Sequence, residues 1–259
     1  NIDWDCKVYR NYADENMGCK QRVSSGLDWV FDQVNEAIIL EDDCVPHATF
    51  FHYCSELLDR YRDDERVMVV SGNNFQPPDR DYGGSYYFSV YNHCWGWATW
   101  RRSWEHYDGN IEAWPDLRET EWLQGWLASE AAAHYWGSIF DRAVRGEIDS
   151  WAYPWTFSCW VQHGLSVLPS VNLVSNIGFG PEATHTKNNS KIVDGQPAYP
   201  ISFPMQHQER IVRDYAADEY TTRNHFGVKT GLDRLGHRYT PGAVKRLVRA
   251  VIGSVKKYR

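Results

Sequence analysis

The stretch AIILEDDCVP, residues 37–46, decides the fold. Its aliphatic first half predicts a short buried strand, and three consecutive carboxylates follow where that strand should end. Pro46 suits a first helical turn and apolar residues recur beyond it at three- and four-residue spacing, so we expect a helix directly after Asp43. In open α/β sheets, ligands bind outside the carboxyl ends of the strands, which is where this order places Glu41, Asp42 and Asp43.

The acidic run has two interpretations. Three adjacent carboxylates repel one another, and a cation bound among them would remove that cost. Alternatively, Asp43 only caps the following helix while Glu41 and Asp42 stay solvated, since Asp is a preferred N-cap residue. The position at the end of a buried strand favours a divalent metal held against phosphate oxygens. Oxygen ligands suit Mg²⁺ or Mn²⁺ better than zinc.

The rest of the chain alternates between strand-like and helix-like segments. Residues 66–74 resemble a second buried strand, and because one helix separates it from the first, we expect a βαβ unit with parallel pairing. Further strands are expected at 85–91 and 165–169, and aromatic-rich helices at 119–145 and 147–163. The sequence therefore predicts an α/β fold with a sheet flanked by helices.

Composition narrows the function. With 259 residues the chain forms one large domain, or one domain with a small appendage, and its net charge of −7 argues against nucleic acid as a partner. Aromatic faces stack on sugar rings as well as on each other, so the 13 Trp and 16 Tyr make carbohydrate a natural ligand class, although most of these rings are expected in the core.

The spacing of the cysteines and the length of the apolar runs predict the cellular compartment of the protein. The six cysteines show no CxxC spacing, so we expect reduced thiols and a cytoplasmic protein. We expect no signal peptide and no membrane span. Residues 241–259 are basic and amphipathic, which fits either peripheral contact with the inner face of a membrane or a helix docked on the protein body. The abrupt start, with a short strand at 6–9, predicts that the first strand of the fold precedes residue 1.

Two glycine-containing segments are candidate ligand-binding loops. In the first, Gly18 follows Asn16 and would let the backbone approach a ligand, while Arg22 could meet phosphate; a turn with solvated cations is the alternative. In the second, Gly96 precedes Trp97, which fits a sugar-binding wall or a tight aromatic turn of the core equally well.

Together these segments resemble the glycosyltransferase-A fold, a Rossmann-like α/β fold, and in particular nucleotide-diphospho-sugar transferases similar to N-acetylglucosaminyltransferase I. The resemblance covers roughly residues 4–190, and the motifs that carry it are Asn16-Met17-Gly18, Ile38-Ile39-Leu40-Glu41-Asp42-Asp43 with Pro46, Gly96-Trp97, Asn172 to Gly180, and Thr184-His185-Thr186. It implies a catalytic domain at 1–190, and residues 191–259 then form a C-terminal extension that ends in the basic helix.

The resemblance also implies a function and a set of roles. The chain would be an inverting hexosyl- or N-acetylhexosaminyltransferase that moves a sugar from a nucleoside-diphosphate donor to a glycan or glycolipid acceptor in polysaccharide biosynthesis. Asp43 would coordinate Mn²⁺ or Mg²⁺, which neutralises the diphosphate leaving group, and His185 is a candidate for the metal or the diphosphate. Glu41 and Asp42 would lie near the ribose and the donor sugar. Asn16, Gly18, Arg22, Gly96 and Trp97 are the other candidate donor contacts.

An inverting transferase needs a general base, and here the sequence departs from the pattern. Related chains read Trp-Asp-Tyr where this one has Trp151-Ala152-Tyr153. Either Asp149 serves as the base, or the base is missing and the chain is an inactivated or altered form. Two other functions compete: a metal-dependent phosphoesterase, and a non-catalytic carbohydrate-binding module that would leave the acidic run unexplained.

Overall fold

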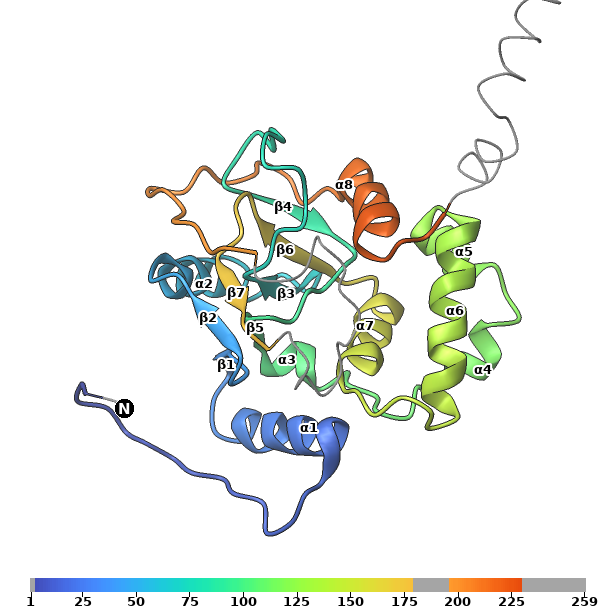
Figure 1. The fold of residues 1–259 in the computed structure, drawn as a ribbon, viewed down its shortest axis with the longest axis horizontal. Coiled ribbons are helices and arrows are strands. Elements are labelled where there is room, and N and C mark those ends of the chain that lie inside the picture. Colours follow the sequence, from blue (N-terminus) through green and yellow to red (C-terminus); the bar gives the residue numbers. More distant parts are fainter. Residues whose placement is uncertain (1–2, 179–195, 230–259) are drawn as a thin grey trace, which may run out of the picture.

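The computed structural model describes residues 3–178 and 196–229. It is an α/β structure with a mixed sheet flanked by helices, as the sequence predicts (Figure 1). The strands are β1 (Glu36–Ile39), β2 (Cys44–Pro46), β3 (Val67–Ser71), β4 (Tyr86–Ser89), β5 (Trp97–Trp100), β6 (Leu165–Pro169) and β7 (Val174–Asn176). The helices are α1 (Gly18–Phe31), α2 (Thr49–Arg60), α3 (Arg101–Trp104), α4 (Trp114–Leu117), α5 (Trp122–Leu127), α6 (Glu130–Val144), α7 (Ala152–Val161) and α8 (Tyr215–Tyr220), followed by a π-helical turn, η1 (Thr221–His225).

The main sheet has the strand order β1-β5-β3-β6-β4. Among the described strands of this sheet, only the β3–β6 pair is parallel. Strand β5 lies between β1 and β3, and its Ala98 pairs with both Ile38 and Val70 in antiparallel register. The expected direct pairing of the first two strands is therefore wrong, although they run in the same direction. Trp97 to Trp100 are all buried, and aromatic and β-branched residues suit such a central strand.

The acidic run is followed by a strand and not by a helix. Strand β2 pairs antiparallel with β7, and α2 begins only at Thr49, so the expected helix directly after Asp43 is wrong. A two-stranded ribbon tolerates Pro46, because proline can occupy an edge position where no N–H is needed. Residues 6–9 form no strand and are exposed.

The long aromatic helix expected at 119–145 is two helices. The break does not fall at either glycine within it: Ala128 adopts a left-handed conformation with φ 53°, and the side chain of Ser129 accepts a hydrogen bond from Ala132 N at 3.2 Å as the N-cap of α6. Helix α7 is confirmed within the expected range of 147–163.

Two apolar clusters sandwich the sheet. On one face α2 packs through Phe50, Tyr53 and Leu57, and on the other α1 and α4–α7 enclose a cluster dominated by aromatic rings. Figure 1 shows α4–α7 together on the side of the sheet away from α2. Eight of the 13 tryptophans are buried, so most of them serve packing, as expected.

Residues 196–229 pack against the body of the fold. Ile201 and Met205 belong to the α2-side cluster, and Asp218 accepts hydrogen bonds from Ser89 of β4 and from Arg213. Among the described residues, no helix is both long and apolar enough to cross a bilayer. The basic stretch 241–259 and His185 lie outside the described residues.

A substitution at Gly72 tests how the β2–β7 ribbon packs against the main sheet. A Cβ at this position would lie 2.6 Å from Val174 Cγ2, 2.7 Å from Phe50 Cε2 and 2.9 Å from Gly96 O, so we expect Gly72→Ala to lower the free energy of unfolding by about 1–3 kcal/mol in urea titrations. Gly125→Ala is the control, because nothing lies within 4 Å of a Cβ added at this exposed position, and the methyl group should stabilise α5 by up to about 1 kcal/mol. Equal effects of the two substitutions would contradict this packing.

Candidate active site

The acidic turn lies between the end of β1 and the β2–β7 ribbon. Ile177 N donates to the backbone oxygen of Asp43 at 2.8 Å, and Gly178 N donates to Asn176 Oδ1 at 2.7 Å. A side chain on Gly178 would overlap the Asp43 carboxylate. The ribbon therefore holds Asp43 beside the residues that follow β7.

The same edge of the sheet carries the carboxyl end of β3. Trp97 pairs with both Ile39 and Ser71, and beyond this level Gly72 N donates to Gly96 O at 2.8 Å. Gly96 has φ 70°, and a Cβ there would lie 2.7 Å from Val174 Cγ2, so its lack of a side chain serves close packing with β7. This edge is where ligands bind in open α/β sheets.

Trp97 faces the core. Its ring is 1% exposed and stacks on Trp151 with centroids 5.3 Å apart. The indole of Trp151 in turn donates from Nε1 to Glu41 Oε1 at 3.2 Å. Through this hydrogen bond the amino end of α7, where a base is expected, is joined to the acidic turn. Of the two interpretations of Gly96-Trp97, this packing supports the tight aromatic turn of the core and not the sugar-binding wall.

Asp149 anchors the amino end of α1. Its carboxylate accepts hydrogen bonds from Cys19 N and Lys20 N, both at 3.0 Å, which stabilises the helix end. Gly18 has φ 75°, and a Cβ there would lie 2.7 Å from Asp149 Oδ2. Asn16 Oδ1 accepts from Gly18 N at 2.9 Å. The close approach that Gly18 permits is thus an approach to Asp149.

The structure therefore brings together three of the predicted segments, 16–18, 41–43 and 149–152. Arg22 lies on α1, and its Nη2 donates to Asn11 O at 2.5 Å. Asp42 is exposed, whereas Glu41 and Asp43 are half-buried. Trp151 holds the Glu41 side chain by a hydrogen bond. Asp42 and Asp43 are therefore the carboxylates of the acidic turn that can face a ligand.

A cavity of about 230 Å³ opens beside this convergence, and we call it the edge cavity. Ala152 lines it, as do Ser150 and the loop from Asn92 to Trp95, but Asp149 does not. Of the two positions considered for a base, 152 is thus the one that faces a space large enough for a reacting group. Sequence reasoning gave no role to the histidines of this cavity, His93 and His225, because a lone His in each segment carries no signal of their contact.

Burial keeps the thiols and imidazoles around the turn uncharged. It raises the pKa of the Cys44 thiol to about 12, and burial together with the charge of Glu41 raises the pKa values of Cys19 and Cys94. Burial holds the pKa of His93 well below its usual range and lowers the pKa of His225 to about 4. At neutral pH these thiols are therefore protonated and these imidazoles neutral.

The turn offers a partial set of metal ligands. No cluster of three His, Cys, Asp or Glu side chains suited to a metal occurs in residues 3–178 and 196–229. The carboxylates of Asp42 and Asp43 are oxygen ligands of the kind that Mg²⁺ and Mn²⁺ prefer, and such cations commonly bind through one or two carboxylates plus substrate phosphates and water. The residues present fit this mode of binding.

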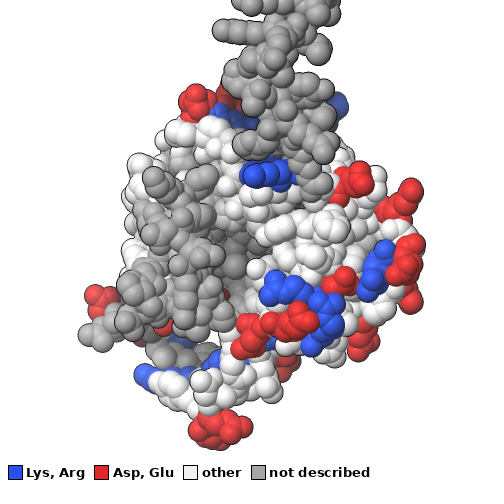
Figure 2. All heavy atoms as spheres, turned by 45° about the vertical axis from the view of Figure 1, so that its right-hand side comes forward, with Lys and Arg blue, Asp and Glu red and all other residues white. Residues whose placement is uncertain are grey.

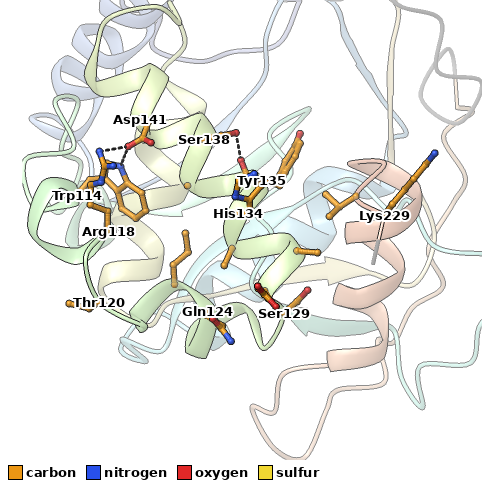
Figure 3. Close-up of a pocket in the computed structure, with 16 residues that line it drawn as sticks. Trp114, Arg118, Thr120, Gln124, Ser129, His134, Tyr135, Ser138, Asp141 and Lys229 are labelled. Atoms are coloured by element: carbon orange, nitrogen blue, oxygen red, sulfur yellow. Dashed lines mark hydrogen bonds and ion pairs between the residues drawn. The ribbon is translucent and has the colours of Figure 1, made fainter. Parts of the chain in front are cut away.

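A larger hollow of about 970 Å³ lies between α4, α5 and α6 (Figure 3). None of the predicted site residues lines it. In Figure 3 Trp114 and Arg118 both point to Asp141, whose Oδ1 accepts from Trp114 Nε1 at 2.9 Å and from Arg118 Nη1 at 3.1 Å. Figure 2 shows acidic and basic side chains intermixed on this part of the surface. Arg118 and Asp141 pair with each other, and the carboxyl ends of β1 and β3 lie elsewhere, so we place the active site at the sheet edge.

Comparison of the chain with protein-family models and with curated protein sequences gives no match. The candidate site is therefore defined by its own geometry.

The buried histidines make stability depend on pH. An unfolded histidine has a pKa of about 6.5, so between that pH and about 4 the unfolded chain binds a proton that folded His225 does not bind. We expect the free energy of unfolding to fall as the pH is lowered through this window, by on the order of 3 kcal/mol for His225, at about 1.4 kcal/mol per pKa unit. Urea titrations from pH 7 to pH 4.5 measure the slope. His225→Phe keeps a ring against Phe75 and should make the slope shallower; an unchanged slope would contradict the assignment.

Proposed function

We propose that the chain is a metal-dependent glycosyltransferase that moves a sugar from a nucleoside-diphosphate donor to a glycan or glycolipid acceptor with inversion. The observation that carries this proposal is the hydrogen bond between Trp151 and Glu41, which joins the acidic turn at the end of β1 to the amino end of α7 beside the edge cavity. A carboxylate turn that could hold a cation against a diphosphate and a cavity for a reacting group then lie next to each other.

In this proposal Asp43 holds Mn²⁺ or Mg²⁺. The bound cation would neutralise charge on the departing diphosphate. Trp151 fixes Glu41, and the exposed Asp42 is left to accept hydrogen bonds from donor hydroxyl groups. The ribbon contacts at Ile177 and Gly178 keep the Asp43 backbone in place, which matters because small displacements of catalytic groups are costly.

The general base is an element of an inverting transferase that the described part of this chain does not supply in an evident position. Asp149 lies outside the lining of the edge cavity and is engaged by two N–H groups of α1, whereas Ala152 lines the cavity and has no proton-accepting side chain. We infer that position 152 is where the base belongs and that the chain as it stands binds its donor but transfers slowly.

Donor binding tests the metal site. We expect calorimetric titration to show that at least one UDP- or GDP-sugar binds and that its binding requires Mn²⁺. Asp43→Asn should weaken this binding by more than about tenfold, because even the loss of a residue that only hydrogen-bonds to a metal ligand can lower metal affinity by that factor. Asp59→Asn is the matched control: this aspartate lies on α2, 75% exposed, and pairs with Arg62, which also bonds Glu36 at the opposite end of β1.

Three results would redirect the assignment. Sugar binding without nucleotide or metal dependence would indicate a carbohydrate-binding module. Release of inorganic phosphate from the donor or from phosphate esters would indicate a phosphoesterase. Nucleotide-sugar binding that Asp43→Asn and Asp59→Asn leave equally intact would remove the acidic turn from the site.

Ala152→Asp tests the position of the base. General-base catalysis contributes about 10²–10⁴-fold, so restoring a carboxylate in the edge cavity should raise the rate of sugar transfer by well over tenfold. Asp149→Asn is the comparison, with urea titrations alongside because this residue also supports α1. If Ala152→Asp gives no gain while Asp149→Asn abolishes transfer in a folded protein, Asp149 is the base.

A further inference from the structure

Two histidines that line the edge cavity each have one ring nitrogen without a partner among the described residues. Within the described part of the chain, His93 Nε2 and His225 Nδ1 are buried and make no hydrogen bond. The two imidazoles come from distant segments, the loop after β4 and η1, and their ring centroids are 5.1 Å apart. His93 is only 8% exposed. Buried polar atoms are nearly always paired in folded proteins, so unpaired nitrogens on two residues that line the same cavity point to a partner that binds there.

The walls of the cavity combine ring faces with neutral polar groups. Phe75 stacks on His225 with centroids 4.2 Å apart and meets His93 edge-on at 4.6 Å. The hydroxyl of Thr156 donates to Asn92 Oδ1 at 2.7 Å, which fixes the Asn92 amide. The other lining groups include Trp95, Ser150 and Tyr153. Such walls suit a ligand with apolar faces and a rim of hydroxyl groups.

Size and charge restrict the ligand further. The volume of about 230 Å³ lies below the range of roughly 300–1,000 Å³ typical of sites for drug-sized ligands, so the cavity holds a single ring and not a whole nucleotide sugar. None of the described lining residues is Asp, Glu, Lys or Arg. A phosphate or carboxylate would therefore find no counter-charge from these residues.

We propose that the edge cavity binds one uncharged pyranose ring, with hydroxyl groups hydrogen-bonded to His93 Nε2 and His225 Nδ1. This rests on the proposed function in one respect: the ring would be the sugar of the donor or the terminal sugar of the acceptor. Ser150 and Ala152, on either side of Trp151, line the cavity, while Trp151 itself bonds Glu41. The ring and the diphosphate thus occupy adjoining sites, the neutral one in the cavity and the charged one at the acidic turn.

The first experiment needs neither nucleotide nor metal. The full chain is titrated with methyl glucoside, methyl galactoside, methyl mannoside and N-acetylglucosamine, and the imidazole ¹H–¹³C resonances of His93 and His225, assigned from single substitutions, are followed by NMR. We expect at least one neutral sugar to shift both resonances. Glucuronic acid and glucose 6-phosphate, which add a negative charge to a similar ring, should not shift them.

Substitutions separate recognition from packing. His93→Leu removes the ring nitrogen and should weaken sugar binding about tenfold. This factor corresponds to the loss of one hydrogen bond whose net free energy is near the upper end of the usual range. His93→Gln keeps a polar group at the end of the side chain and should recover part of the affinity. His134→Leu is the control, because this exposed histidine lines the larger hollow and not the edge cavity.

Nucleotide titrations distinguish the source of the ring. If it belongs to the donor, His93→Leu weakens binding of the UDP- or GDP-sugar but not of UDP or GDP alone. If it belongs to the acceptor, donor binding is unchanged and the neutral sugar binds alongside it. The proposal is overturned if no neutral sugar shifts the two resonances at saturating concentration and His93→Leu leaves nucleotide-sugar affinity intact, whatever Asp43→Asn does to metal-dependent binding.

Discussion

The packing of Val174 between two glycines is the constraint on which the candidate site depends. Gly72 and Gly96 each leave room for the same valine side chain, and Gly72 also bonds both Gly96 and Leu173 through its backbone. This contact seats β7 on the end of the main sheet. Because β2 pairs with β7, it also determines where the acidic turn ends and which way Asp43 is presented. A change in side-chain volume at either glycine would be transmitted to the turn, since close-packed interiors do not absorb extra atoms.

A second set of contacts, which are hydrogen bonds to carboxylates, positions the residues on the α7 side of the site. The Asp149 carboxylate meets the amino end of α1, and two residues later Trp151 donates to Glu41. One short segment thus fixes a helix end and an acidic side chain together. The stacked pair of Trp97 and Trp151 supports this segment from the core side, so the aromatic core of the fold positions the groups at its edge.

The sequence predicted the class of fold and the acidic turn because both depend on local pattern. An aliphatic run followed by carboxylates can be recognised within ten residues, as can the helices whose apolar residues repeat. Strand order is not local: nothing in residues 37–46 or 66–74 indicates that β5 would lie between them. The role of Gly18 was ambiguous for the same reason, since its neighbour Asp149 is far away in sequence. The edge cavity was missed because His93 and His225 acquire meaning only when η1 folds against the loop after β4.

The segment from 196 to 229 carries an ion pair of its own, Arg213 with Asp218, whose side chains are 9% and 3% exposed. Both charges lie on the same stretch of chain, five residues apart in sequence, and the Ser89 hydroxyl and Val90 N–H add hydrogen bonds to Asp218 from β4 and the residue after it. The segment can therefore dock on β4 as an electrically neutral unit. This permits an order of folding in which the sheet forms first and receives the segment afterwards, without either partner having to bury an unpaired charge along the way.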